Sequence, residues 1–303
     1  MYMWMIYDEE GLERNRDYVA MYKERCIEYD IEVEAVLDTC VSERITGGEA
    51  PVFVLVRTIN PAINKYLESA GIPVFNSYRV SQICNDKGRT LQYMREKVLS
   101  VPTLCFDNSE LSRIRSMDIR SLHACFHNQF SYSVFEEQER KMVEDAEDFV
   151  LKAVDGHGGK QVFSFCHDWN LLEEGIGRSG FVLQPMIKNN GLSRDVRVYV
   201  IGKNIFAAVL RSSAEDFRAN FSRGGTVELY SLNETEREKV DRIVKEFDFG
   251  MAGIDFILDS CGNMILNEIE DVVGARMLYQ CEPNSDIVGE YLRYIMEKKL
   301  HIV

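Results

Sequence analysis

The second half of the chain is a series of short apolar and β-branched runs, which is the pattern of β-strands. These predicted strands span residues 149–154, 181–186, 196–201, 205–210, 227–230, 254–258 and 264–269. Two neighbouring pairs of runs are separated only by the polar segments 202–204 and 259–262, each short enough for a hairpin turn. Because hairpins join antiparallel strands, this half is predicted to form largely antiparallel sheets.

Residues 1–77 show a different pattern, in which helical and strand signals alternate. Residues 52–56 form a near-continuous apolar strand, and Asn60 and Pro61 supply the N-cap and first-turn proline of a helix that ends at Gly71. We therefore expect a small N-terminal α/β domain. Further domains must follow it, because 303 residues are about twice the length of a typical domain.

The rest of the chain is predicted to form two lobes, residues 78–187 and 188–303. In the first lobe a helix begins near Asp86, and residues 107–147 mix helical fragments with an acidic run, which predicts a mainly helical insertion. In the second lobe the clearest helix opens with the spacing of a capping box. Its cap residues are Asn233 and Glu236. The predicted fold class is therefore α/β (α+β).

Charge and cysteine content narrow the classes of function. The chain has 35 Lys and Arg against 49 Asp and Glu, a net charge of −14, which disfavours nonspecific binding to nucleic acid. The sequence contains neither a long apolar run nor a leader-like start, so we expect a cytoplasmic protein that does not bind membranes. The 8 cysteines form no Cys-x-x-Cys pair and are expected to be buried, reduced thiols.

Three carboxylates are predicted to converge near the end of the strand region. Alternation along a strand places Glu268 and Glu270 on one face, and the hairpin partner can present Asp255 beside them. Like charges this close repel strongly unless a cation neutralises them. Oxygen ligands of this kind suit Mg²⁺ or Mn²⁺, usually shared with phosphates. The alternative is a solvated acidic strand face.

Arginines gather in the same region of a chain that is acidic overall. Arg197 lies in one predicted strand, Arg211 ends the next, and residues 217–225 add further arginines and glycines. Guanidinium groups bind phosphate oxygens through two parallel hydrogen bonds, and glycines let backbone amides approach an anion. Any single arginine is equally well explained as a solvated loop residue, but the whole set indicates an anion site.

Lys152 lies inside an apolar strand and is followed at once by the glycine-rich turn 155–160. A lysine at an inward strand position usually meets an anion. The turn is not a Walker A loop, because Val154 and Gln161 occupy positions where that motif needs Gly and Ser or Thr. His123 and His127 have helical i, i+4 spacing, but no third ligand is evident, so a surface or core role is favoured over metal binding.

The order of these features resembles the ATP-grasp superfamily and, within it, the RimK-like branch of carboxylate–amine ligases. The resemblance spans roughly residues 50–280. It is carried by segments 85–87, Lys152 with its glycine-rich loop, 183–187, 195–197, Arg211 with 217–225, and Asp255 with 268–270. It implies a small N-terminal pre-ATP-grasp domain followed by a two-lobed ATP-grasp fold.

The resemblance also implies a role for each matching residue. Two groups would bind ATP, the first through its phosphates and the second through main-chain hydrogen bonds to adenine. The phosphate group is Lys87, Lys152, Gly156, Gly158 and Gly159, and the adenine group is Gln184, Pro185, Met186 and Ile187. The transferred phosphoryl group and the acyl acceptor would face Arg197, Arg211 and Asn220. One or two Mg²⁺ or Mn²⁺ ions would be held by Asp255, Glu268 and Glu270.

The implied activity is ATP-dependent formation of an amide bond through an acylphosphate, with release of ADP and phosphate. Its partners would be a small-molecule or peptide carboxylate and an amine such as an amino acid, and a homo-oligomer is compatible with it. Alternatives are a phosphotransferase and a regulatory ATP-binding protein that keeps the fold. Two positions depart from the usual pattern: Glu270 stands where Asn is common, and Pro185 stands where Glu is common.

Overall fold

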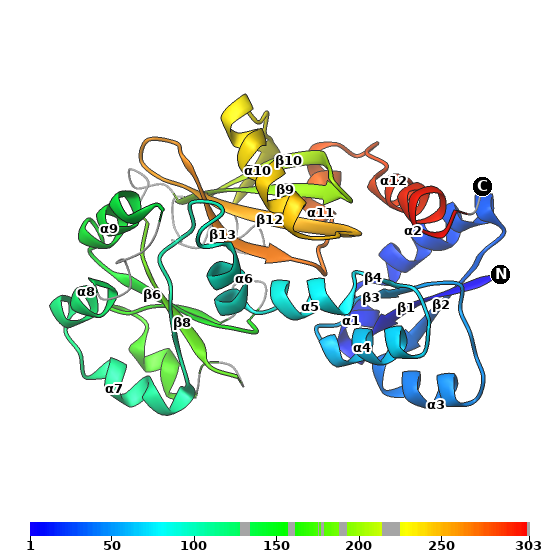
Figure 1. Ribbon diagram of the computed structural model, residues 1–303, viewed down its shortest axis with the longest axis horizontal. Helices are drawn as coiled ribbons and strands as arrows, with labels where there is room; N and C mark the ends of the chain where they lie inside the picture. Colours follow the sequence, from blue (N-terminus) through cyan, green and yellow to red (C-terminus); the bar gives the residue numbers. More distant parts are fainter. Residues whose placement is uncertain are drawn as a thin grey trace.

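Three β-sheets organise the chain, as Figure 1 shows. The computed structural model describes residues 1–127, 134–156, 161–174, 176, 179–187, 193–213 and 225–301. Among these residues, strands follow the order β2-β1-β3-β4 in the first sheet, β5-β8-β6-β7 in the second and β11-β10-β9-β12-β13 in the third. The predicted combination of an N-terminal α/β unit with antiparallel sheets is confirmed.

The first sheet is parallel and belongs to the N-terminal unit. Its strands are β1 (Tyr2–Tyr7), β2 (Glu32–Leu37), β3 (Val54–Val56) and β4 (Val74–Phe75). Its helices are α1 (Glu9–Arg14), α2 (Arg16–Cys26), α3 (Val41–Thr46) and α4 (Pro61–Ser69). Asn60 caps α4 by accepting a hydrogen bond from the Ala62 amide, as predicted. β1, an inner strand of this sheet, was not predicted from the sequence.

The second sheet is antiparallel and carries the predicted helical insertion. Its strands are β5 (Leu104–Phe106), β6 (Phe149–Ala153), β7 (Val162–Ser164) and β8 (Phe181–Pro185). The insertion contains α7 (Leu111–Arg115), α8 (Ile119–His127) and α9 (Glu136–Glu144). Their buried residues share one core with the sheet, in which Phe126 stacks on Phe149. His123 contacts the ring of Phe149 edge-on, which agrees with a core role.

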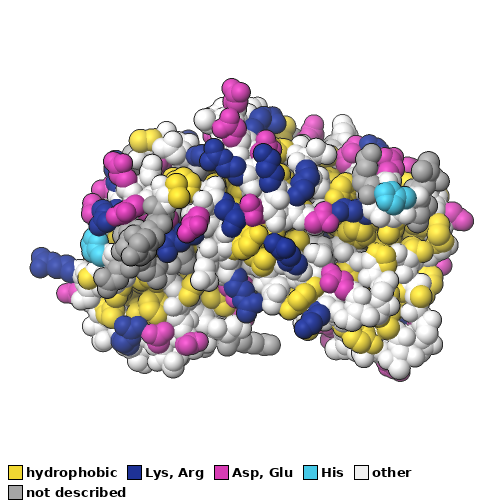
Figure 2. Space-filling model, viewed as in Figure 1, with side chains coloured by type: hydrophobic (Ala, Val, Ile, Leu, Met, Phe, Trp, Pro, Cys, Tyr) yellow, Lys and Arg dark blue, Asp and Glu magenta, His cyan; other side chains and the backbone are white. Residues whose placement is uncertain are grey.

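The third sheet is also antiparallel. Its strands are β9 (Ser193–Ile201), β10 (Asn204–Ser213), β11 (Thr226–Leu229), β12 (Met251–Leu258) and β13 (Met264–Glu270). One face packs against α5 (Tyr78–Cys84), α6 (Lys87–Met94) and α10 (Glu234–Glu246). The predicted capping box at Asn233 and Glu236 is present at the start of α10. Lys and Arg side chains gather over this part of the molecule in Figure 2, with acidic side chains among them.

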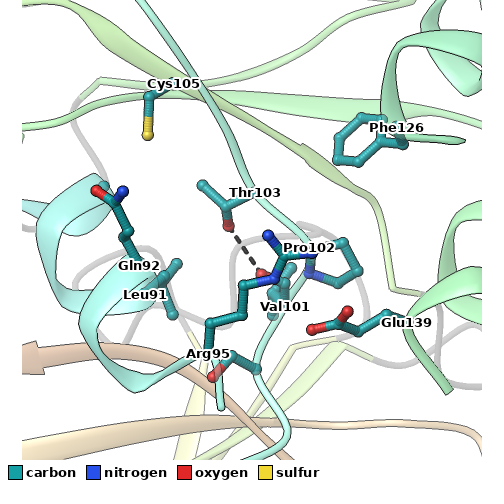
Figure 3. A pocket seen from close by; sticks show the side chains of 11 residues that line it. Leu91, Gln92, Arg95, Val101, Pro102, Thr103, Cys105, Phe126 and Glu139 are labelled. Atoms are coloured by element: carbon teal, nitrogen blue, oxygen red, sulfur yellow. Dashed lines mark hydrogen bonds between the residues drawn. The ribbon is translucent and has the colours of Figure 1, made fainter. Parts of the chain in front are cut away.

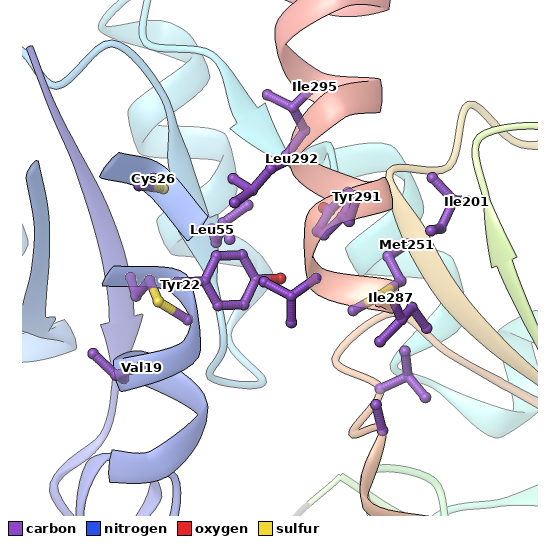
Figure 4. Packing of buried hydrophobic residues seen from close by; sticks show 14 of the residues in the cluster. Val19, Tyr22, Cys26, Leu55, Ile201, Met251, Ile287, Tyr291, Leu292 and Ile295 are labelled. Carbon is purple, nitrogen blue, oxygen red and sulfur yellow. The ribbon is translucent and has the colours of Figure 1, made fainter. Parts of the chain in front are cut away.

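The C-terminal helices connect the third sheet to the N-terminal unit. They are α11 (Arg276–Cys281) and α12 (Ile287–Arg293), and a π-helical segment, Tyr294–Leu300, continues α12. Figure 4 shows how Tyr22 and Cys26 of α2 face Tyr291 and Leu292 of α12 in one buried cluster. Ile201 and Met251 extend this cluster into the third sheet. The two parts therefore share a core, and the division at residues 77 and 187 stays a prediction.

Two further expectations concern the burial of the cysteine thiols and the absence of a membrane-spanning helix. All eight cysteines are free, but only Cys26 and Cys84 are buried. The expectation of burial is wrong for the other six, of which three are half-buried and three are exposed. Burial does raise the pKa of Cys84, so that thiol stays protonated. Among the described residues, no helix combines the length and apolar character needed to cross a membrane.

Candidate active site

A β-bulge in β13 decides which face of the third sheet the acidic residues occupy. Strict alternation would put Glu268 on the same face as Met264 and Leu266, which pack into the core with α10. The register shifts instead, because Asp255 pairs with Glu268 while Phe256 pairs with Leu266, so that Asn267 is the extra residue. The bulge thereby turns Glu268 and Glu270 onto the opposite, polar face.

The bulge brings the three predicted carboxylates together. One oxygen each from Asp255, Glu268 and Glu270 lies within 4.8 Å of the others. Asp255 is 1% exposed, whereas Glu268 and Glu270 are about one-fifth exposed, at 22% and 19%. Solvent therefore reaches the cluster at Glu268 and Glu270 of β13 but not at Asp255. Its geometry suits a divalent cation, and its role as a metal site stays a prediction.

Two buried arginines neutralise Asp255 from the neighbouring strands. Arg197 of β9 donates from Nε and Nη2 to the two carboxylate oxygens at 2.7 and 2.6 Å, and its Nη2 also lies 2.9 Å from Glu270. Arg211 of β10 donates from Nη2 to Asp255 at 2.8 Å and pairs through Nε with Asp195. Both arginines are thus fixed on the polar face, with Nη1 carrying no hydrogen bond to any described residue.

Two lysines approach the same cluster from the other side. Lys87, the first residue of α6, lies 3.0 Å from Glu268 and also donates to the Gly156 carbonyl at the start of the glycine-rich turn. Lys152 of β6 donates to the bulge residue Asn267 at 2.8 Å. The cluster therefore joins the second and third sheets, which is where a ligand held by both lobes would lie.

Burial and charge shift the pKa values of these groups in different directions. Burial lowers the pKa of Lys152 to about 8, so its ammonium form lacks full compensation. Burial opposes ionisation of Asp255, but Arg197 and Arg211 override it and hold the pKa of this carboxyl well below its usual range. Burial raises the pKa of Glu270 in spite of Arg197. The surroundings consequently disfavour the charged form of Glu270, whereas they strongly stabilise the charged form of Asp255.

The cluster is close to electrical balance. Its carboxylates are Asp195, Asp255, Glu268 and Glu270, and its cations are Lys87, Lys152, Arg197 and Arg211. These four acids and four bases are all largely withdrawn from water, so each charge depends on its neighbours. Asp195 and Asn267 were not predicted as site residues, although both belong to this cluster. The i, i+2 spacing of Asp195 to Arg197 in the sequence places both on one face of a strand and could have indicated Asp195. No feature of the sequence indicates the bulge at Asn267.

The predicted adenine-binding segment lies at the end of β8. Gln184 is buried and donates from Nε2 to the Thr103 hydroxyl at 2.8 Å, and the Met186 amide donates to the Asp148 carbonyl at 2.9 Å. Pro185 has no amide proton. Within 185–187, Ile187 is therefore the residue whose amide donates to no residue that the structure describes. Gly158, Gly159, Asn220 and most of 217–225 lie outside the described residues.

A cavity of about 230 Å³ lies beside this segment, but its lining does not include the predicted site residues. Figure 3 shows Thr103 and Cys105 on one wall, with Phe126 and Glu139 opposite. Gly88 and Leu91 of α6 are also part of its lining. The cavity is therefore distinct from the carboxylate and cation cluster.

Solved structures identify the fold. The chain matches a D-alanine–D-alanine ligase from Bacillus anthracis in complex with ATP, with a TM-score of 0.67 and 15% identity over 99% of this chain and 98% of that one. It also matches the ATP-grasp ligase PsnB in complex with a precursor variant, Mg and ADP, with a TM-score of 0.61 and 17% identity over 95% of each chain. The fold is thus the ATP-grasp fold, as the sequence predicted.

Sequence comparison places the chain within that class. The RimK-like ATP-grasp domain model matches residues 112–295, so the protein belongs to the RimK-like ATP-grasp family. The "Uncharacterized protein MG011" of Mycoplasma genitalium is 31% identical over 151 residues, 49% of this chain and 52% of that protein. The human "N-acetylaspartylglutamate synthase A" is 23% identical over 90% of this chain and 70% of that protein.

A third relative carries a ligase name. The "Probable alpha-L-glutamate ligase" of Cellvibrio japonicus is 28% identical over 55% of this chain and 56% of that protein. The chain spans 52% and 64% of the length of two of the Mycoplasma relatives that it matches.

Proposed function

We propose that this protein is an ATP-dependent carboxylate–amine ligase that forms an amide or peptide bond. The observation that carries the proposal is the junction of the two antiparallel sheets, where Lys87, Lys152, Arg197 and Arg211 surround three carboxylates with oxygens within 4.8 Å of one another. Cations positioned for phosphates beside ligands for a divalent ion are the parts that phosphoryl transfer needs.

The residues fit a divalent ion and a triphosphate. Asp255, Glu268 and Glu270 supply the hard oxygens that Mg²⁺ or Mn²⁺ prefers, and such an ion would neutralise charge on the phosphates. Lys152, whose charged form is disfavoured in the buried site, would regain its full charge beside a phosphate. The Ile187 amide would donate to adenine.

The chain's own cations would act on the transferred phosphoryl group. A substrate carboxylate oxygen attacks the γ-phosphorus and ADP leaves; the amine then attacks the acyl carbon, phosphate leaves and the amine nitrogen gives up a proton. Arg197 and Arg211 would stabilise the moving negative charge through the N–H groups not used on Asp255. Their pairing with Asp255 and Asp195 fixes them in advance, so little reorganisation is needed during the reaction.

The decisive experiment measures ADP release with ATP, Mg²⁺ and panels of carboxylates and amines. A ligase is expected to release ADP in an amount that depends on both partners, with the amide detected by mass spectrometry. ADP release without amine dependence, with an acylphosphate trapped by hydroxylamine, would identify a phosphotransferase instead. Absence of ADP release under all combinations would favour a regulatory ATP-binding protein.

The charge balance of the cluster predicts that metal and nucleotide bind together. Mg²⁺ alone would leave the site with excess positive charge, and ATP alone would place a polyanion against the carboxylates. We expect neither to change Tm appreciably, whereas the two together at 100 times their Kd should raise it by about 5 °C, because ligand bound only by the native state stabilises it. A differential scanning experiment with all three conditions checks this. An equal shift with ATP alone would contradict the metal assignment.

A further inference from the structure

Lys152 differs from the other three cations of the carboxylate and cation cluster in the kind of partner that it has. Lys87 lies 3.0 Å from Glu268, and each of the two arginines binds a carboxylate. Lys152 instead donates from Nζ to the side-chain oxygen of Asn267 at 2.8 Å. Among the described residues, no carboxylate oxygen lies within 4.0 Å of this Nζ. The direct partner of Lys152 is therefore a neutral amide.

Burial makes the neutral partner of Lys152 important. Withdrawal from water lowers the pKa of its ammonium group to about 8, although Glu268 and other carboxylates nearby act in the opposite direction. An ammonium group carries three N–H donors, and Asn267 is the acceptor that the described residues offer to them. An anion that enters the site would therefore find both charge and donors of Lys152 available.

Asn267 has a fixed place because its neighbours in β13 are bound on both edges of the strand. On one edge, Glu268 pairs with Asp255 of β12. On the other edge, Leu266 forms two backbone hydrogen bonds with segment 99–101, at 3.0 and 2.9 Å. A β-bulge between such fixed neighbours redirects a side chain without loosening the backbone. The fold thus presents the Asn267 side chain to Lys152 across the junction of the second and third sheets.

A neutral side chain at position 267 has a different consequence from a charged one. A carboxylate there would form an ion pair with Lys152 in the empty site, and a phosphate would then only replace one charged partner by another. With the amide in place, a phosphate adds Coulombic attraction that the neutral acceptor does not provide. A fifth carboxylate in the cluster would also repel the phosphates of a nucleotide. Asn267 therefore holds Lys152 without competing for its charge.

We propose that Asn267 is a positioning residue for ATP: its neutral side chain holds Lys152 at the junction of the two sheets and presents the ammonium group to the phosphates. Asn267 acts through Lys152 and is not itself a ligand of the phosphates or the metal ion. The proposal deepens the proposed ligase function and rests on it only for ATP as the ligand. The chemical identity of residue 267 thereby sets the affinity of the site for the nucleotide.

Calorimetric titration of the full chain with ATP and Mg²⁺ tests the proposal in a double-mutant cycle. The four proteins are the native chain, Asn267→Asp, Lys152→Met and the double variant. Asn267→Asp keeps the shape of the side chain and should raise the Kd for ATP at least about tenfold, because Lys152 gains a competing carboxylate. In the Lys152→Met background the same change should alter the Kd less than about threefold, since the residue on which it acts is absent. Equal weakening in both backgrounds would indicate simple charge repulsion and overturn the proposal.

Three further variants keep the test decisive. Asn267→Gln retains a neutral acceptor and should bind ATP within about threefold of the native affinity. Asn204→Asp adds the same charge at the exposed start of β10 and should leave the Kd unchanged. If the Tm without ligand shows that Asn267→Asp folds poorly, Asn267→Leu replaces it in the cycle. This variant removes the acceptor without adding charge, and it should weaken ATP binding only where Lys152 is present.

Failure of this proposal and failure of the proposed function give different results. Equal affinity of the native chain and Asn267→Asp for ATP would overturn the positioning role, whatever the native chain does in the ADP-release experiment. The predicted pattern of affinities without any amide product would refute the ligase function and still support the role of Asn267. No binding of ATP to the native chain would overturn both.

Discussion

Asp255→Asn is expected to lower turnover by at least a thousandfold and to reduce the free energy of unfolding by about 3–5 kcal/mol, the cost of breaking a buried ion pair. Asp255 is 1% exposed and accepts three hydrogen bonds from Arg197 and Arg211. The asparagine leaves these two guanidinium groups close together with too little negative charge between them. It also removes the most deeply buried of the three clustered carboxylates.

The two effects of this substitution are measured separately. ADP release reports the loss of turnover, and urea unfolding reports the loss of stability. The control is Glu238→Gln, which breaks an exposed pair with Arg242 on α10 and should change stability by less than about 0.5 kcal/mol.

A double variant shows which effect comes from the unpaired charge. Adding Arg211→Met to Asp255→Asn removes one of the uncompensated cations and should restore part of the stability while leaving the protein inactive. If Asp255→Asn alone is as stable as the native protein, the buried ion-pair network does not hold the site together in the way described above.

The sequence predicted the outline of this fold because its strongest signals are local. The capping box of α10 and the N-cap at Asn60 depend on residues three or fewer apart, and both form as predicted. β1 was not assigned because its residues are buried on both faces and so show no alternation. A continuous apolar run at a chain start is consistent with several structures, and only its partners on either side make it a central strand.

Most residues of the charged cluster were predicted from the sequence, Asp195 and Asn267 excepted, but the way in which the fold brings them together was not. Alternation along β13 correctly places Glu268 and Glu270 on one face, yet without the bulge at Asn267 that face would be the hydrophobic one. The bulge depends on pairing with β12 and cannot be seen in β13 alone. Lys87, Arg197 and Arg211 were expected to face phosphates. In the structure they pair with the carboxylates of Asp255 and Glu268. The reason is that buried charges need partners of opposite sign in the native fold itself.

Glu268→Gln and Glu270→Asn are expected to differ sharply, although the two residues lie on the same face of one strand. Glu268 is the ion-pair partner of Lys87, which also donates a hydrogen bond to the Gly156 carbonyl. The charge of Glu268 therefore links α6 and the glycine-rich turn to the three-carboxylate cluster. Removing that charge should lower turnover by at least a thousandfold. Glu270 pairs only with Arg197 among the described residues, and Arg197 remains held by both oxygens of Asp255.

Glu270→Asn should therefore keep measurable turnover while requiring a higher Mg²⁺ concentration. Burial raises the pKa of Glu270, which means that the fold supports its charge poorly and loses little when an amide replaces it. The amide oxygen still offers a ligand to the ion, but with one negative charge less, so metal affinity falls. ADP release measured across a Mg²⁺ titration separates the two variants: Glu270→Asn should recover with added metal and Glu268→Gln should not. Equal inactivity of both at every Mg²⁺ concentration would show that Glu270 does more than bind metal, and full activity of both would place the metal site elsewhere.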